Sequence, residues 1–228
     1  MKYAILGGTG VDELDSFSSL QSFKTEYGSV DYVISDDIVL LPRHSYGHSV
    51  PPHMINYKAN ITLLKELGVE KVVSIYAVGS ITEKLKPLQW GVVDDFMDFT
   101  GNVSTFFTGG SKGVKHIDMT DVFDSGLSLA LAEYAPVKEE LVYVTTAGPR
   151  LETRSEIKAY RSLGADVVGM TLSHEAVLMK ESGIKNASIA YSINWACGVS
   201  EELSFVCDDD IATLTSGIMT VARRVLHG

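Results

Sequence analysis

The chain has 228 residues, of which 45% are hydrophobic, and 19 basic against 29 acidic side chains give a formal net charge of −10. This composition supports a packed core and excludes a disordered chain, while the acidic charge disfavours binding to nucleic acid or to an anionic membrane. No apolar run approaches the roughly 18 residues of a membrane span or forms a secretory leader. We therefore expect a cytoplasmic protein with one domain over residues 1–228.

Apolar strand-like runs and helical patterns alternate along the whole chain. Apolar runs predict strands over residues 3–6, 32–34, 38–41, 71–76, 91–97, 140–146, 167–170 and 187–193. Helical spacing of apolar residues predicts helices over 54–67, 122–134, 153–163, 173–181 and 208–226. The strands at 32–34 and 38–41 are predicted to form a hairpin, and the Gly-, Ser- and Thr-rich residues 102–116 a long loop. This order favours an α/β fold with a mostly parallel sheet and helices on its faces.

The turn Gly7-Gly8-Thr9-Gly10 directly follows the first predicted strand. Its backbone N–H groups and the Thr9 hydroxyl suit an oxyanion, and ligands of α/β sheets bind at this edge. The turn lacks the complete dinucleotide-binding glycine pattern and the lysine of a P-loop. It is equally typical of a phosphate-binding loop and of a plain tight turn.

Arg43 and His44 follow another predicted strand, and His48 lies close behind. Arginine recognises phosphate through two parallel N–H groups, and a histidine supplies a further donor. An isolated Arg-His pair is more typical of a solvated loop. The preceding apolar strand favours a functional role.

Two further polar residues follow predicted strands. Glu152 lies beyond the Gly148-Pro149 turn, where its carboxylate could accept hydrogen bonds from ring N–H groups, or could simply belong to the first turn of a helix. Asn194 is polar within an apolar and aromatic stretch, and its amide both accepts and donates. On its own it is also consistent with a residue that ends a strand.

The motifs of several other enzyme classes are absent from this sequence. The six histidines and two cysteines show no metal-site spacing, and no G-x-S-x-G sequence indicates a serine hydrolase. The incomplete glycine pattern disfavours a dinucleotide-dependent enzyme.

Taken together, several segments resemble the trimeric purine nucleoside phosphorylases, in particular the methylthioadenosine phosphorylase branch. The matching segments, in the order of that family, are GGTGV, LPRHSYGHSVPPHMINYKANI, YAVGS, HIDM, TAGPRLETRSEI, GADVVGMTLSHEAVLMKESGI and SIAYSINWACG. The resemblance implies a single-domain nucleoside phosphorylase fold, with a mixed central β-sheet flanked by helices. It also implies phosphate-driven cleavage of a purine nucleoside to a free base and a ribose 1-phosphate.

The resemblance further implies a role for each matching residue. Phosphate is expected at Thr9, Arg43, His44, the backbone of Ala77, and Thr171. The nucleoside is expected at Leu151, Glu152, Met170 and Asn194, with His116 reaching the 5′ end of a neighbouring subunit's substrate. His44, Glu152 and Asn194 are the expected catalytic residues. Inorganic phosphate is the co-substrate, no metal or organic cofactor is implied, and the expected assembly is a homotrimer or a dimer of trimers.

The base pocket departs from the methylthioadenosine branch. That branch carries aspartates where this chain has Asn194 and Ala196, and a serine where it has Glu152. The Glu-plus-Asn combination is similar to the inosine and guanosine phosphorylases, which indicates a 6-oxopurine nucleoside as substrate. The alternatives are an adenine-type methylthioadenosine phosphorylase with an atypical pocket, and a nucleoside-binding protein without turnover.

The 5′ side and residue 76 also depart from these relatives. Where the inosine and guanosine enzymes place a histidine on the 5′-hydroxyl, this chain has apolar Phe205 and Val206. These residues favour a 5′-methylthio group, and thus 5′-methylthioinosine. Tyr76 replaces a small polar residue beside the phosphate site, where it could stack or crowd.

Overall fold

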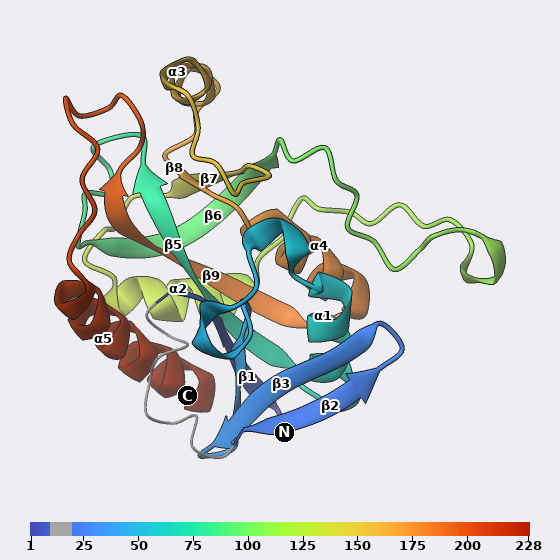
Figure 1. Ribbon diagram of the computed structural model, residues 1–228. Coiled ribbons are helices and arrows are strands. Elements are labelled where there is room, and N and C mark those ends of the chain that lie inside the picture. Colours follow the sequence, from blue (N-terminus) through green and yellow to red (C-terminus); the bar gives the residue numbers. More distant parts are fainter. Residues whose placement is uncertain (10–19) are drawn as a thin grey trace.

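A computed structural model describes residues 1–9 and 20–228, and in it nine strands form one sheet with helices on both sides (Figure 1). The strands are β1 Tyr3–Gly7, β2 Gln21–Thr25, β3 Gly28–Ser35, β4 Ile38–Pro42, β5 Lys71–Ser80, β6 Trp90–Asp98, β7 Leu141–Thr145, β8 Val167–Gly169 and β9 Lys185–Trp195. The α-helices are α1 Tyr57–Glu66, α2 Ser125–Tyr134, α3 Arg154–Ser162, α4 Leu172–Ser182 and α5 Asp208–His227. The expected mixed sheet flanked by helices is confirmed.

Five of the nine strands form a closed ring within the sheet. Its order is β2-β3-β4-β1-β5-β8-β7-β6-β9, and β9 also pairs with β5 along its whole length. Strands β5, β8, β7, β6 and β9 therefore form a closed ring, in which β5–β8 and β6–β9 are antiparallel and the other pairs parallel. The sequence predicted the strands but not this closure, because closure depends on pairings between distant segments.

The predicted hairpin is present and is longer than expected. β3 and β4 pair antiparallel, with Val33 opposite Leu40, and Asp36 and Asp37 adopt φ of 49° and 66° at the turn. Aspartate tolerates this left-handed conformation because its short side chain bonds locally. β2 adds a further antiparallel strand at the edge of the sheet that the sequence did not predict.

The helix predicted over 54–67 begins three residues later, at Tyr57. Pro52–Met54 instead form a separate 3-10 turn, and Ile55 is extended. The Asn56 side chain then accepts from the N–H of Ala59 at 3.1 Å, which caps the first turn of α1. The capping residue, rather than the apolar spacing, sets where this helix begins.

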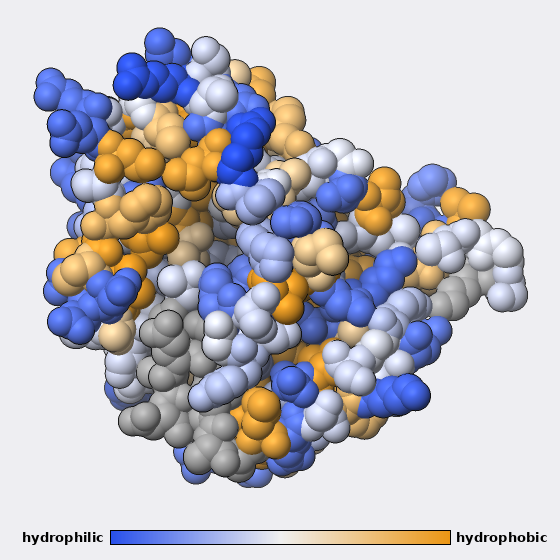
Figure 2. Space-filling view, viewed as in Figure 1, coloured by the Kyte–Doolittle hydropathy of each residue, from blue (hydrophilic) through white to orange (hydrophobic). Residues whose placement is uncertain are grey.

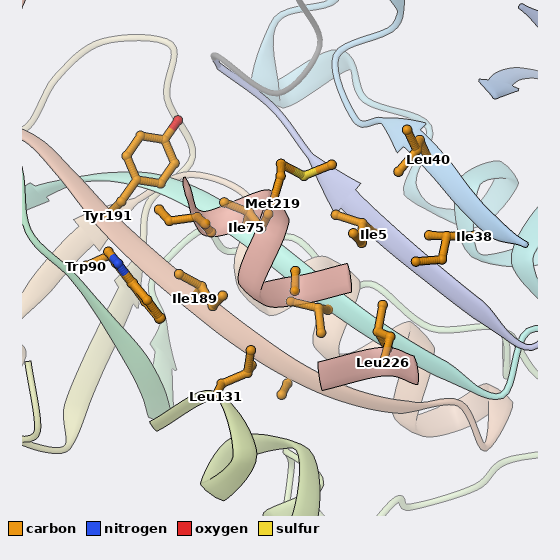
Figure 3. Close-up of a cluster of buried hydrophobic side chains, with 14 of the residues drawn as sticks. Ile5, Ile38, Leu40, Ile75, Trp90, Leu131, Ile189, Tyr191, Met219 and Leu226 are labelled. Atoms are coloured by element: carbon orange, nitrogen blue, oxygen red, sulfur yellow. The ribbon is translucent and has the colours of Figure 1, made fainter. Parts of the chain in front are cut away.

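The core lies in layers on the two faces of the sheet. α2 and α5 cover one face, where Ile5, Ile75 and Ile189 of three adjacent strands pack against Met219 of α5 (Figure 3). On the other face α1 and α4 pack against β1, β3 and β4 through a second cluster that includes Leu63 and Leu178. Because both faces are covered, the ends of the strands are the accessible part of the sheet.

No helix among residues 1–9 and 20–228 is both long enough and apolar enough to cross a membrane.

Candidate active site

One cavity opens at the carboxyl ends of β1, β4, β5, β8 and β9. Nine of the residues expected to bind phosphate or nucleoside line it together: Thr9, Arg43, His44, Ala77, Leu151, Glu152, Met170, Thr171 and Asn194. They are far apart in the sequence, and the pairing of these strands, parallel for β1, β4, β5 and β9 and antiparallel for β5 and β8, brings them together. Gly10, the last residue of the predicted phosphate turn, lies outside the described residues.

At one end of the cavity, Gly8 faces the side chains of Arg43 and His44. A Cβ added at Gly8 would lie 3.0 Å from His44 Cδ2 and 3.1 Å from Arg43 Nη1. A side chain at this position would therefore occupy the space in front of both nitrogen-bearing groups. The backbone carbonyl of the next residue, Thr9, accepts a hydrogen bond from the hydroxyl of Tyr191, which ties the turn to β9.

The Arg43 side chain is buried and hydrogen-bonded to other groups of the protein. Its Nε and Nη2 donate to the two oxygens of Glu175 on α4 at 2.6 and 2.8 Å, and Nη1 donates to the carbonyl of Ile75 at 2.9 Å. Burial lowers the pKa of Arg43, but the carboxylate of Glu175 outweighs this and raises it above its ordinary value, so the guanidinium stays charged. The expected two-point grip on phosphate is therefore not offered, because Glu175 occupies the fork.

Among the residues that the structure describes, one N–H of Arg43 has no partner and remains for a ligand. A guanidinium has five N–H groups. Four contacts to protein oxygens account for Nε, Nη2 and one hydrogen of Nη1, the weakest being that from Nη2 to the carbonyl of Leu6 at 3.5 Å. The second N–H of Nη1 lies on the atom that faces Gly8.

His44 presents a single nitrogen to the same space. Its Nδ1 lies 2.8 Å from the carbonyl of Val50, and since a carbonyl only accepts, Nδ1 carries a proton. Nε2 is the atom on the Gly8 side. The ring also stacks on His48, with centroids 4.1 Å apart.

Thr171, the residue directly before α4, completes this end. It occupies the N-cap position, and its side chain makes no capping hydrogen bond. The N-terminus of a helix carries partial positive charge and orphan N–H groups, which suit an anion. The cavity end formed by Gly8, Thr9, Arg43, His44 and Thr171, here called the anion end, can thus hold a small oxyanion.

At the other end, a buried carboxylate is held by a single hydroxyl. Thr146 Oγ1 donates to Glu152 Oε1 at 2.6 Å, and Glu152 is 7% exposed. Oε2 has no hydrogen-bond partner within the described part of the chain. Thr146 was not among the predicted site residues, although its place at the end of a strand, in the TTAG segment, was a usable signal.

A β-bulge brings Asn194 into the cavity. Along the β5–β9 pair, Val78 lies opposite Ser192 but Gly79 lies opposite Asn194, so that β9 carries one extra residue, Ile193. The extra residue breaks the alternation of faces, and both Ile193 and Asn194 line the cavity. Asn194 Nδ2 donates to the carbonyl of Trp195 at 2.8 Å, which leaves its second N–H and Oδ1 for a ligand.

Two expected substrate residues lie outside this cavity. Val206 packs against the core beside α5, because its N–H pairs with the carbonyl of Ile193 and turns its side chain inward; the preceding residue, Phe205, lines the cavity instead. His116 is exposed on the segment between β6 and α2, which projects from the body of the molecule (Figure 2). Within one chain, His116 is not part of the site.

Within the described ranges, no group of three or more His, Cys, Asp or Glu side chains is placed to hold a metal ion. The cavity's polar groups are suited to anion binding and to hydrogen bonding.

Comparison with known proteins decides the family. The model of the phosphorylase superfamily matches residues 2–227. The chain belongs to this superfamily.

Relatives of this phosphorylase carry names of two kinds. A Pyrococcus furiosus protein named 6-oxopurine nucleoside phosphorylase is 40% identical, over 87% of this chain and 81% of its own. A Methanocaldococcus jannaschii protein named a probable S-methyl-5′-thioinosine phosphorylase is 42% identical, over 98% of this chain and 91% of its own. Among solved structures, methylthioadenosine phosphorylase from Schistosoma mansoni in complex with tubercidin has a TM-score of 0.85 at 28% identity, over 99% and 91% of the two chains.

We predict that Gly8→Ala weakens phosphate binding about tenfold or more, since the added methyl group fills the space in front of Arg43 Nη1 and His44. Thermal unfolding with and without phosphate measures this, because a ligand of the folded state raises the melting temperature. Gly217→Ala is the matched control, since a Cβ there meets open space. Equal phosphate-induced shifts in both variants would contradict the assignment of the anion end.

Proposed function

We propose that the protein cleaves 6-oxopurine nucleosides with inorganic phosphate, releasing the free base and a ribose 1-phosphate. The observation that carries this proposal is the buried Glu152 side chain, which lines the cavity and has one carboxylate oxygen held by Thr146, while the other has no hydrogen-bond partner among the described residues. The names of relatives at about 40% identity support the same substrate class.

The hydrogen-bonding pattern of the base favours the 6-oxo form. A 6-oxopurine presents N1–H as a donor, which Glu152 Oε2 accepts, and O6 and N7 as acceptors, one of which the free N–H of Asn194 meets. A 6-aminopurine places the N1 lone pair against the carboxylate. A mispairing of this kind in a buried site costs about 1–3 kcal/mol for each unsatisfied group. Sites built on such bonds reject the wrong base strongly.

In the proposed mechanism, phosphate attacks C1′ as the bond to the base breaks, through a ribosyl group of oxocarbenium character. The anion end holds phosphate through Arg43 Nη1, His44 and the start of α4. Met170 lies under the ribose. Asn194 stabilises the negative charge that develops on the departing base, and Glu152 fixes its orientation. Catalysis thus comes from positioning and from electrostatic stabilisation.

An apolar 5′ substituent fits the cavity wall better than a hydroxyl. Phe205 lines the cavity beside Asn194, to which it is joined by an isolated backbone bridge. Each buried CH₂ contributes about 0.8 kcal/mol, so a methylthio group gains from this contact. We therefore favour 5′-methylthioinosine over inosine and guanosine.

The proposed assembly is a homotrimer or a dimer of trimers in the cytoplasm. The projecting segment that carries His116 supports it, because an exposed histidine on such a segment could reach the cavity of a neighbouring subunit. Both cysteines are free thiols, as is usual in a reducing compartment.

We predict base release from 5′-methylthioinosine, inosine and guanosine only when phosphate is present, with methylthioadenosine slower by about a hundredfold or more. The rate should be highest for 5′-methylthioinosine. Chromatographic measurement of free base from each nucleoside, with and without phosphate, tests this. Efficient adenine release would assign the protein to the adenine type, whereas purine binding without any release would indicate a binding protein.

We predict that Asn194→Asp shifts the preference toward 6-aminopurine nucleosides. A carboxylate accepts from the exocyclic amino group but repels O6, so the ratio of kcat/KM for 6-oxo against 6-amino substrates should fall about tenfold or more. Asn102→Ala, an exposed position on the projecting segment, is the control. An unchanged ratio in Asn194→Asp would remove Asn194 from base recognition.

A further inference from the structure

Tyr76 is fully buried in β5, yet it contacts both members of the Arg43–Glu175 ion pair. Its hydroxyl donates to Glu175 Oε2 at 2.7 Å, and its ring lies under the guanidinium of Arg43, with Cζ 4.3 Å from the ring centroid. Burial, and then the negative charge of Glu175, raise the pKa of Tyr76 well above its ordinary value, so the phenol keeps the proton that it donates.

The pair that Tyr76 contacts stands directly behind the anion end. Glu175 is 0% exposed, and its carboxylate neutralises the charge of Arg43. An oxyanion in front of Arg43 therefore meets a cation that already has a counter-ion. Any donor that draws charge from the carboxylate leaves Arg43 a stronger partner for a second anion, an effect that is enlarged in a low-dielectric interior.

The same contacts fix the direction of the guanidinium. The two oxygens of Glu175 and the carbonyl of Ile75 lie around its edge, and the Tyr76 ring lies against its face. Arg43 Nη1 is thereby held toward Gly8. Residue 76 acts on the site from behind, since Tyr76 itself does not line the cavity.

We propose that Tyr76 is a positioning residue for phosphate: its hydroxyl shares the charge of Glu175 and its ring supports Arg43, so that Arg43 Nη1 binds the anion. This inference rests on the proposed function, with phosphate at the anion end. Of the two expectations for Tyr76 beside the phosphate site, stacking or crowding, it favours stacking of the ring on Arg43.

Tyr76→Phe tests the hydroxyl while keeping the ring. We expect the KM for phosphate to rise about fivefold to tenfold, with kcat at saturating phosphate and the KM for nucleoside within about twofold of wild type. Tyr32→Phe is the matched control, since it removes another buried tyrosine hydroxyl, one that donates to Gln21 at 3.0 Å on an edge strand. It should leave the KM for phosphate unchanged. A purely structural role would lower the melting temperature in both variants without separating the two KM values.

A second variant covers the case in which Tyr76→Phe does not fold. Replacement of Tyr76 by 3-fluorotyrosine keeps the ring and makes the hydroxyl a stronger donor, so the KM for phosphate should fall. A KM for phosphate that is unchanged in every one of these variants that folds, while wild type requires phosphate, would overturn this inference alone. Base release by wild type without phosphate would instead overturn the proposed function.

Discussion

The buried ion pair between Arg43 and Glu175 is the contact on which the anion end depends. A carboxylate with no exposure to water needs a permanent cation, and removing one partner of such a pair typically costs about 3–5 kcal/mol. The pair joins the end of β4 to α4, the helix whose N-terminus carries Thr171. It thus sets the distance between two elements that face the same anion, and it fixes which nitrogen of Arg43 is turned outward.

The scaffold and the base specificity are separate properties of this chain. Solved structures of methylthioadenosine phosphorylases share its fold closely, although the relatives of higher identity are named for 6-oxopurine and methylthioinosine substrates. A fold of this kind supports either preference. We propose that the choice in this chain depends on the Glu152 carboxylate facing N1 of the base.

Local signals in the sequence were enough to predict most helices and strands, and to predict which residues lie at the ends of strands. Apolar runs located β1, β4 and β5, and the parallel sheet then placed Thr9, Arg43 and Asn194 at one edge. β2 escaped prediction because its QSFKT sequence has a single large apolar residue. The partners of the site residues were not predicted for a different reason. Glu175 lies 132 residues from Arg43 in the sequence, and no local sequence pattern indicates such a contact. The bulge at Ile193 likewise depends on how two distant strands pair.

A crystal structure of the protein with bound phosphate would show directly how Arg43 contacts the anion. Our expectation is that Glu175 keeps both oxygens on Arg43 Nε and Nη2 and that Tyr76 keeps its hydrogen bond to Glu175. Phosphate should then contact Arg43 through Nη1 alone, with His44 Nε2 beside it. A guanidinium that leaves Glu175 and grips phosphate with two parallel N–H groups would contradict it.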